Sequence, residues 1–159
     1  MTRLGLKAAF RYGEKLTAFK SMEEAEKYFF TYKDKLLGKF EKKCAQYNFF
    51  TPDYSVESLK KLEKIYFDLY ETGSFRKTGL SRDEFESAMS IYFGEVVVRN
   101  NDEAKFEVRE FPFAQGKYEF YISKGLLSVA IADRFRDLYK QPSNVRKNHM
   151  FREYNRYFK

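Results

Sequence analysis

Cysteine, histidine and tryptophan are almost absent from this chain of 159 residues. It has one cysteine, Cys44, one histidine, His149, and no tryptophan. A single cysteine excludes an internal disulfide, and one histidine with one cysteine cannot fill a zinc site without carboxylates. Nucleophilic catalysis by a serine or cysteine would require His149 beside the nucleophile. The sequence carries no catalytic or metal-binding signature, so we expect a protein that is not an enzyme.

Long hydrophobic runs are missing as well. A membrane-spanning helix needs about 20 consecutive apolar residues, and no run in the chain comes near that length. Residues 1–6 contain no apolar segment long enough for a secretory signal. The glycine-rich patterns that cradle nucleotide phosphates are absent too. We therefore expect a cytoplasmic protein with no membrane partner and no cofactor.

Aromatic and charged residues are plentiful instead. The 18 phenylalanines and 13 tyrosines make up 19% of the chain, and charged residues make up 33%. The aromatic rings can build a large core, and the charges give a well-solvated exterior. A chain of this length buries roughly 70% of its unfolded surface. We expect a single domain over residues 1–159, with residues 1–20 as an N-terminal arm or short helix.

The first half of the chain has the pattern of amphipathic helices. Ser21 and Glu24 form a capping box, and apolar residues follow it at steps of three and four. The apolar face consists of Ala25, Phe29, Tyr32, Leu36, Phe40, Cys44 and Tyr47. A second helix is expected to begin near residues 53–55 and to end before Gly73, which suits a left-handed cap.

A third helix is expected to start at the capping box of Ser81 and Glu84. The helical period continues as far as Val96, so the helix should run through Gly94 and into the valines at 96–98. A glycine inside a helix costs about 1 kcal/mol relative to alanine, which a close approach of another element would justify. Asn100–Asn101 should end the helix, because asparagine tolerates the left-handed terminating conformation.

Strands follow in the second half. Residues 105–109 and 117–122 alternate apolar and polar side chains, which predicts an antiparallel hairpin. Apolar residues spaced by three and four over 127–138 predict a further helix, and Ser143 or Asn144 would cap a last one. The expected fold class is α+β and mostly helical, with four to five helices and one antiparallel β-hairpin. The expected core contains Phe29, Tyr32, Leu36, Phe85, Met89, Phe93, Phe106 and Phe120.

Charge is unevenly distributed along the chain. The formal net charge is +7, and residues 134–159 alone hold eight basic and two acidic side chains. The candidate binding residues of this segment are Arg146, Lys147, Arg152, Tyr154 and Arg156. Basic side chains interleaved with tyrosine suit phosphate contacts and base stacking, and the same charge suits an acidic protein partner equally well. Both a nucleic acid and an acidic protein therefore stay open as partners.

Two single residues have alternative interpretations. Cys44 lies on the apolar face of the long helix, so we expect it to be a small buried hydrophobic side chain. Glu95 follows Gly94 beside an aromatic cluster, where burial could raise its pKa and make it a functional acid or base. The alternative, which we favour, is that Glu95 points outward or pairs with Arg99 four residues later.

The segment Tyr92-Phe93-Gly94-Glu95-Val96-Val97 is followed by a polar turn over residues 100–105 and by Phe106-Glu107-Val108. This order resembles several uncharacterised bacterial families of small α+β proteins, which usually carry tryptophan where Phe106 stands. Some members are encoded beside polymorphic toxins or mobile elements and are thought to be immunity or accessory proteins. No catalytic residues are established for them, so the resemblance implies an interaction protein and assigns no site.

The sequence therefore favours a non-enzymatic bacterial binding protein, immunity-like or antitoxin-like, that acts by occluding a partner with a rigid surface. Aromatic or arginine anchors would supply most of the affinity. The alternative is a basic accessory protein that binds nucleic acid through its C-terminal segment. An enzyme of unrecognised type comes third.

Overall fold

The computed structural model describes residues 2–159, and their fold is α+β and mostly helical, as the sequence predicted. Six α-helices, two short 3₁₀ helices and three strands occur in this part of the chain. In chain order they are α1 (Arg3–Lys15), α2 (Met22–Tyr47), α3 (Ser58–Thr72), η1 (Phe75–Thr78), α4 (Arg82–Asn100), β1 (Ala104–Glu110), β2 (Tyr118–Lys124), β3 (Leu127–Ala130), η2 (Leu138–Lys140), α5 (Ser143–Arg146) and α6 (His149–Tyr157).

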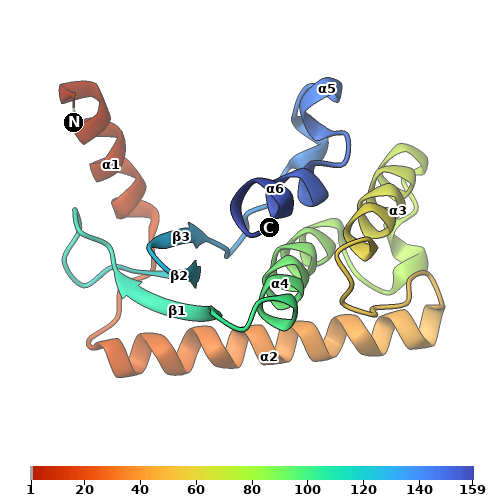
Figure 1. The fold of residues 1–159 in the computed structure, drawn as a ribbon, viewed down its shortest axis with the longest axis horizontal. Helices are drawn as coiled ribbons and strands as arrows, with labels where there is room; N and C mark the ends of the chain where they lie inside the picture. The colour runs from red at the N-terminus through yellow and green to blue at the C-terminus, as the bar shows by residue number, and fades with distance from the viewer. Residues whose placement is uncertain (1) are drawn as a thin grey trace.

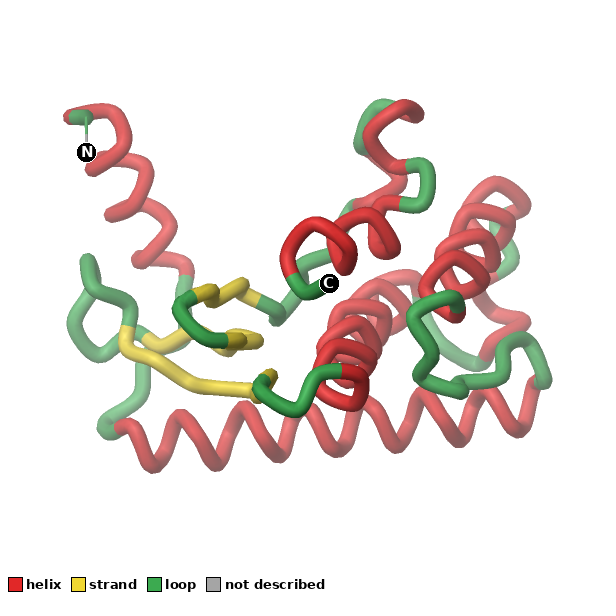
Figure 2. Tube along the Cα trace, in the orientation of Figure 1, coloured by secondary structure: helices red, strands yellow, loops and turns green. Residues whose placement is uncertain are grey.

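The long helix α2 runs along one side of the molecule, and α4, β1, β2 and η1 pack on it (Figure 1). The Ser21 hydroxyl accepts a hydrogen bond from the Glu24 backbone N–H, which confirms the predicted start. Figures 1 and 2 show the strands and α1 above the N-terminal half of α2, with α3 and α4 over the rest. The buried residues of α2 are Ala25, Phe29, Leu37, Phe40 and Cys44.

Helix α4 lies across the middle of α2 and is buried on nearly all sides (Figure 1). Both hydrogen bonds of the predicted capping box form: the Ser81 hydroxyl accepts from the Glu84 backbone N–H, and the Glu84 carboxylate accepts from the Ser81 backbone N–H. The valines at 96–98 belong to the helix, so the helical period outweighs their β-propensity. One detail of the prediction was wrong, because Asn101 is extended rather than left-handed. The side chains of Asn100 and Asn101 end the helix by donating to the carbonyls of residues 96 and 97.

The predicted close approach at Gly94 is present. A Cβ atom at this position would lie 2.8 Å from Cε1 and Cζ of Phe106 and 3.1 Å from Cδ1 of Ile122. Phe106 belongs to β1 and Ile122 to β2, so the glycine lets helix α4 lie directly on the sheet. Only a residue without a side chain fits this contact with no rearrangement.

The sheet has the order β1-β2-β3 and is antiparallel throughout. The predicted hairpin is confirmed, with Phe106 opposite Ile122 and Val108 opposite Phe120. The helix predicted over 127–138 is wrong: residues 127–130 form β3, which pairs with β2, and residues 132–137 form turns before η2. Gly125 adopts a positive φ of 61°, and the tight turn it allows returns the chain along the open edge of β2.

The C-terminal segment also departs from the prediction. Two helices, α5 and α6, replace the single one expected, because Asn148 takes a left-handed conformation between them. Neither predicted cap is used, since α5 begins after Pro142. The start of α6 is capped from α3, where the buried Glu63 carboxylate accepts the backbone N–H groups of residues 149 and 150.

The predicted core is largely confirmed. Phe29, Phe85, Met89, Phe93 and Phe120 are buried in one cluster. Tyr32, Leu36 and Phe106 are partly buried and pack against it. Residues 1–20, expected as an arm or short helix, form α1 from Arg3 onward and then a short bridge in which Ala18 pairs with Lys117.

Candidate functional site

The carboxylate predicted as a possible functional group, Glu95, forms ion pairs inside the chain. One oxygen lies 3.2 Å from the Lys33 ammonium nitrogen and the other lies 3.2 Å from Nε of Arg99. The contact with Arg99 is the favoured alternative of the sequence interpretation. Glu95 is buried where α4 faces α2, so its charge joins these two helices.

Cys44 is buried on α2, as expected. Desolvation, with a further contribution from Glu41, raises the pKa of its thiol to about 12. The thiolate is the reactive form of cysteine, so this side chain stays protonated at neutral pH. It packs as a small hydrophobic group.

Most of the predicted C-terminal binding residues contact the chain itself. Arg146 donates to the Tyr139 carbonyl at 2.7 Å and lies over the ring of that tyrosine. Arg152 donates to the carbonyl of Lys147 at 2.9 Å. Tyr154 is buried and its hydroxyl accepts from Asn101, so its ring is not available for stacking on a base. Arg156 is exposed and lies over the ring of its neighbour Tyr157.

The last predicted residue, Lys147, lies in a groove between α3 and the α5–α6 junction. This groove, which we call the basic groove, has a volume of about 410 Å³. Its lining residues are Lys60, Lys61, Glu63, Lys64, Phe67, Asp68, Lys147 and Asn148. The fold thus brings one residue of the predicted segment beside three lysines of α3 that sequence reasoning did not connect with it.

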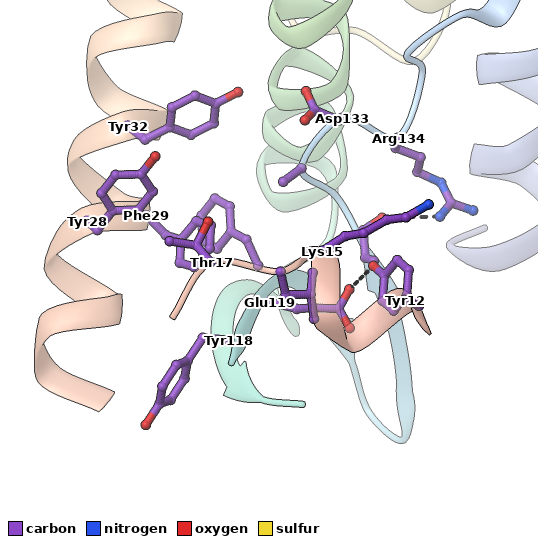
Figure 3. Close-up of a pocket in the computed structure, with 14 residues that line it drawn as sticks. Tyr12, Lys15, Thr17, Tyr28, Phe29, Tyr32, Tyr118, Glu119, Asp133 and Arg134 are labelled. Carbon is purple, nitrogen blue, oxygen red and sulfur yellow. Dashed lines mark hydrogen bonds between the residues drawn. The ribbon is translucent and has the colours of Figure 1, made fainter. Parts of the chain in front are cut away.

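A larger hollow, which we call the aromatic cleft, lies between α1, α2, β2 and the turn after β3 (Figure 3). Its volume is about 520 Å³. Figure 3 shows Tyr28, Phe29 and Tyr32 of α2 on one side, with Tyr12, Lys15 and Glu119 across from them. The remaining lining residues are Leu16, Thr17, Tyr118, Phe120, Ala130, Ala132, Asp133 and Arg134.

The acidic group on the floor of the cleft is Glu119, a buried residue of β2. It accepts hydrogen bonds from the hydroxyls of Tyr12 and Tyr121. Burial and the hydrogen bonds to Glu119 raise the pKa of both tyrosines, which therefore stay protonated and act as donors. Because Tyr12 belongs to α1, this contact fixes one wall of the cleft against the sheet.

Two further charges at the cleft are held by partners in the chain. Asp133 accepts from Ser87 and from Arg136, each at 3.0 Å. Arg134 binds both oxygens of Glu153, at 2.6 and 3.1 Å. Both contacts of Asp133 use one carboxylate oxygen, Oδ1, whereas Arg134 would have to give up hydrogen bonds to Glu153 to meet a ligand.

The lysines at the rim of the cleft, unlike Asp133 and Arg134, have no ionic partner among residues 2–159. The side chain of Lys15 at the cleft makes no ion pair or hydrogen bond with residues 2–159. A shallower hollow of about 490 Å³ adjoins the cleft and shares Tyr28 and Tyr32 with it. Lys27 and Lys35 line this second hollow and are equally without an ionic partner in the described part of the chain. The two hollows together form one surface of aromatic rings with lysines at its edge.

Comparison with known proteins places most of the chain in one family. The model of the family described as "Uncharacterised protein YwmA" matches residues 18–158. The chain belongs to the YwmA family. The uncharacterized protein YwmA of Bacillus subtilis (strain 168) is 26% identical over 136 residues, which cover 86% of this chain and 86% of that protein. No solved structure matches the chain. The family membership confirms the resemblance to uncharacterised bacterial α+β proteins.

The residues that match the YwmA family model form most of the aromatic cleft but not all of it. Tyr28, Phe29 and Tyr32, the strand residues and the turn after β3 lie inside residues 18–158. Tyr12, Lys15, Leu16 and Thr17 lie before that region. The wall built by α1 therefore covers a surface whose other sides belong to the YwmA domain.

No group of three or more His, Cys, Asp or Glu side chains within residues 2–159 is arranged to hold a metal ion. None of the helices in this part of the chain is long and apolar enough to cross a membrane.

Sequence reasoning missed the aromatic cleft. The only local signal is the pair Tyr28 and Tyr32, which are four residues apart and share a face of α2. The other walls come from segments far away in the chain, and no sequence pattern connects them.

Proposed function

We propose that this chain is a non-enzymatic binding protein that recognises an acidic protein partner through the aromatic cleft and the hollow beside it. Binding there acts by occlusion: the rigid surface covers a site on the partner, in the manner of immunity or antitoxin proteins. The single observation that carries the proposal is the continuous surface on which Tyr28 and Tyr32 are shared by two adjoining hollows.

The composition of this surface supports protein binding. Tyrosine is enriched among the residues that contribute most to protein–protein affinity, because its ring is large, rigid and polar at one end. Tyr28 is 50% exposed and therefore loses substantial solvent contact when a partner covers it. Helix α2 packs on the core through Ala25 and Phe29, and the neighbouring strand β2 is mostly buried, so the surface is held in place before binding.

The charge at the edge supports an acidic partner. Lys15, Lys27 and Lys35 surround the tyrosines and make no ion pair with residues 2–159. Opposite charges across the edge of an interface accelerate association and select the partner. The two carboxylates of the cleft, Glu119 and Asp133, already have hydrogen-bond donors and oppose such a partner less than free carboxylates would.

Photo-crosslinking in the native host tests the proposal. A benzophenone amino acid replaces Tyr28, and the matched control carries it at Tyr47, which is 43% exposed on the same helix but lies away from the cleft. We expect a discrete crosslinked adduct from position 28 that position 47 does not give. No adduct, or the same adducts from both positions, would refute the proposal.

Charge reversal adds a second criterion. Lys27→Glu with Lys35→Glu should reduce the adduct formed at position 28, because both charges then repel an acidic partner. Lys42→Glu with Lys77→Glu changes the net charge equally at exposed positions away from the cleft and should leave the adduct unchanged. Equal loss in both variants would mean that net charge, and not this surface, governs binding.

A second candidate function is supported by the basic groove. Lys61, Lys64 and Lys147 come from two distant segments and meet there, which is the kind of cluster that contacts phosphates. The burial of Tyr154 removes one of the rings expected to stack on bases. Nucleic-acid binding through this groove therefore ranks second, and its salt dependence tests it.

A further inference from the structure

Helix α1 is attached to the rest of the molecule through its C-terminal half. The Tyr12 hydroxyl donates to Glu119, and Gly13 packs so closely that a Cβ there would lie 2.8 Å from the Cβ of Ala114. The ring of Phe10 touches Phe113 edge-on. The first turns of the helix rise away from the sheet and from α2 (Figure 1).

The projecting part of α1 exposes large apolar side chains. Leu4 is 80% exposed, Leu6 37% and Phe10 50%. A protein of this size exposes isolated apolar residues routinely, but Leu6 and Phe10 are four residues apart and share one face of α1, with Leu4 on another face of the same turns. Their exposure costs free energy in water, which burial in another apolar medium would recover.

Cations accompany these apolar residues at a regular spacing. Arg3, Lys7 and Arg11 follow one another every four residues, so they form a stripe along one side of α1. All three are exposed, and none makes an ion pair or a hydrogen bond through its side chain with residues 2–159. Glu14 is the single acidic residue of the helix.

We propose that α1 docks the protein onto an anionic lipid surface. A helix with exposed leucine and phenylalanine beside a row of lysine and arginine lies in the plane of a membrane interface, with its apolar residues in the boundary region and its cations at the lipid phosphates. Such a helix rests on the membrane and does not cross it. The short length of α1, 13 residues, is compatible with this mode of binding.

The arrangement of the molecule supports a flat lipid surface as the occupant. Helices α1 and α5 both project to the side opposite α2 (Figure 1). The tip at α5 carries Val145, which is exposed, and Lys147 follows it. A planar anionic surface can meet both tips together. A nucleic acid would satisfy the cations but offers little to Leu4, Leu6 and Phe10.

Vesicle co-sedimentation at physiological salt tests the proposal. We expect the full chain to bind vesicles of equal parts phosphatidylcholine and phosphatidylglycerol, and not vesicles of phosphatidylcholine alone. Each cation near an anionic surface contributes roughly five-fold in affinity, so Lys7→Gln with Arg11→Gln should weaken binding about 25-fold. The charge-matched control, Lys42→Gln with Lys77→Gln, should bind like the unchanged protein. Equal weakening by both pairs would overturn the role of α1.

The apolar contribution is tested separately. Leu4→Ser with Leu6→Ser leaves the charge and the contact of Phe10 with Phe113 unchanged and should also weaken vesicle binding, whereas a purely electrostatic contact would be unaffected. If the Lys7 and Arg11 replacements instead abolished binding to duplex DNA, and no variant affected vesicles, the stripe would belong to a nucleic-acid site and the lipid proposal would be wrong.

The absence of tryptophan makes a direct reporter available. Phe10→Trp introduces the one indole of the chain at the proposed contact, and its emission should shift to the blue when anionic vesicles are added. Tyr47→Trp, on the far end of α2, should show no shift. Sedimentation of the protein without a shift at position 10 would place the contact elsewhere and overturn the proposal.

Discussion

Replacement of Gly94 tests how the fold is packed. At this position a methyl group would meet the edge of the Phe106 ring at 2.8 Å and Ile122 at 3.1 Å. Alanine gains about 1 kcal/mol over glycine as a helix former, whereas overpacking costs about 1–3 kcal/mol. We therefore expect Gly94→Ala to lower the free energy of unfolding by an amount between zero and about 2 kcal/mol. Gly94→Leu adds three more carbons to a filled space and should exceed that loss clearly.

Gly38 provides the matched control. It lies inside helix α2 and a Cβ added there meets nothing within 4 Å. Gly38→Ala should therefore stabilise the protein by about 1 kcal/mol, and Gly38→Leu should be tolerated. The helix-propensity gain is common to both alanine variants, so the difference between Gly38→Ala and Gly94→Ala isolates the packing cost at about 1–3 kcal/mol.

Urea unfolding monitored by circular dichroism measures these differences, and thermal melts should follow at about 2–4 °C per kcal/mol for a chain of this size. A second change checks the cause: Phe106→Leu removes the ring edge that faces Gly94, so it should partly rescue Gly94→Ala in a double-mutant cycle. Equal effects of alanine at positions 38 and 94, or no coupling to Phe106, would refute the close approach of α4 to the sheet.

Three other predictions follow from the structure. Phe93 is buried against Phe135 at 5.2 Å between ring centroids, so Phe93→Ala should cost about 3–5 kcal/mol in urea unfolding; a loss well below this range would contradict its central place. Burial raises the pKa of Glu63, so the folded protein keeps the proton of this carboxyl to higher pH than the unfolded chain does. The contribution of this carboxyl to the free energy of unfolding therefore falls as the pH rises through and above the pKa that the carboxyl has in the unfolded chain. The stability of the protein relative to Glu63→Gln should therefore decline as the pH rises above about 4.5, and a rise in relative stability would refute the assignment. If the basic groove binds duplex DNA, Lys61→Ala with Lys147→Ala should flatten the log–log salt dependence in fluorescence anisotropy by about two units; an unchanged slope would place the phosphate contacts elsewhere.

The long helices could be predicted because every local signal agreed. Helices α2 and α4 each begin with a serine cap and a glutamate three residues later, and each has a continuous helical period. Gly94 could also be interpreted in advance, since a glycine in the middle of a strong helix implies a close neighbour. The identity of that neighbour, the ring of Phe106, depends on the tertiary fold.

Strand β3 could not be predicted from the same kind of signal. Leu127, Ile131 and Phe135 have helical spacing, yet the chain reaches them through a tight turn at Gly125 and pairs with the open edge of β2. Ile131 and Phe135 are buried all the same, in turns and not in a helix. Spacing identified which side chains enter the core but not the backbone conformation that brings them there, because sheet pairing overrode local preference.

The sequence and the structure direct attention to different candidate sites, for a physical reason that concerns charge. The formal charge treats every arginine and lysine alike, and by this measure residues 134–159 carry a large excess of positive charge. In the fold, Arg146 and Arg152 donate to backbone carbonyls that would otherwise lack partners, and Arg134 neutralises Glu153. These cations stabilise the irregular C-terminal segment, whose few helical turns leave many carbonyls to satisfy. Lys15, Lys27 and Lys35 lie on or beside regular helices whose backbone groups are already paired, so their charge remains available to a partner. The irregular C-terminal segment therefore uses Arg134, Arg146 and Arg152 internally. Lys15, Lys27 and Lys35 instead line hollows that contain exposed aromatic rings, and their ammonium groups have no ionic partner in residues 2–159.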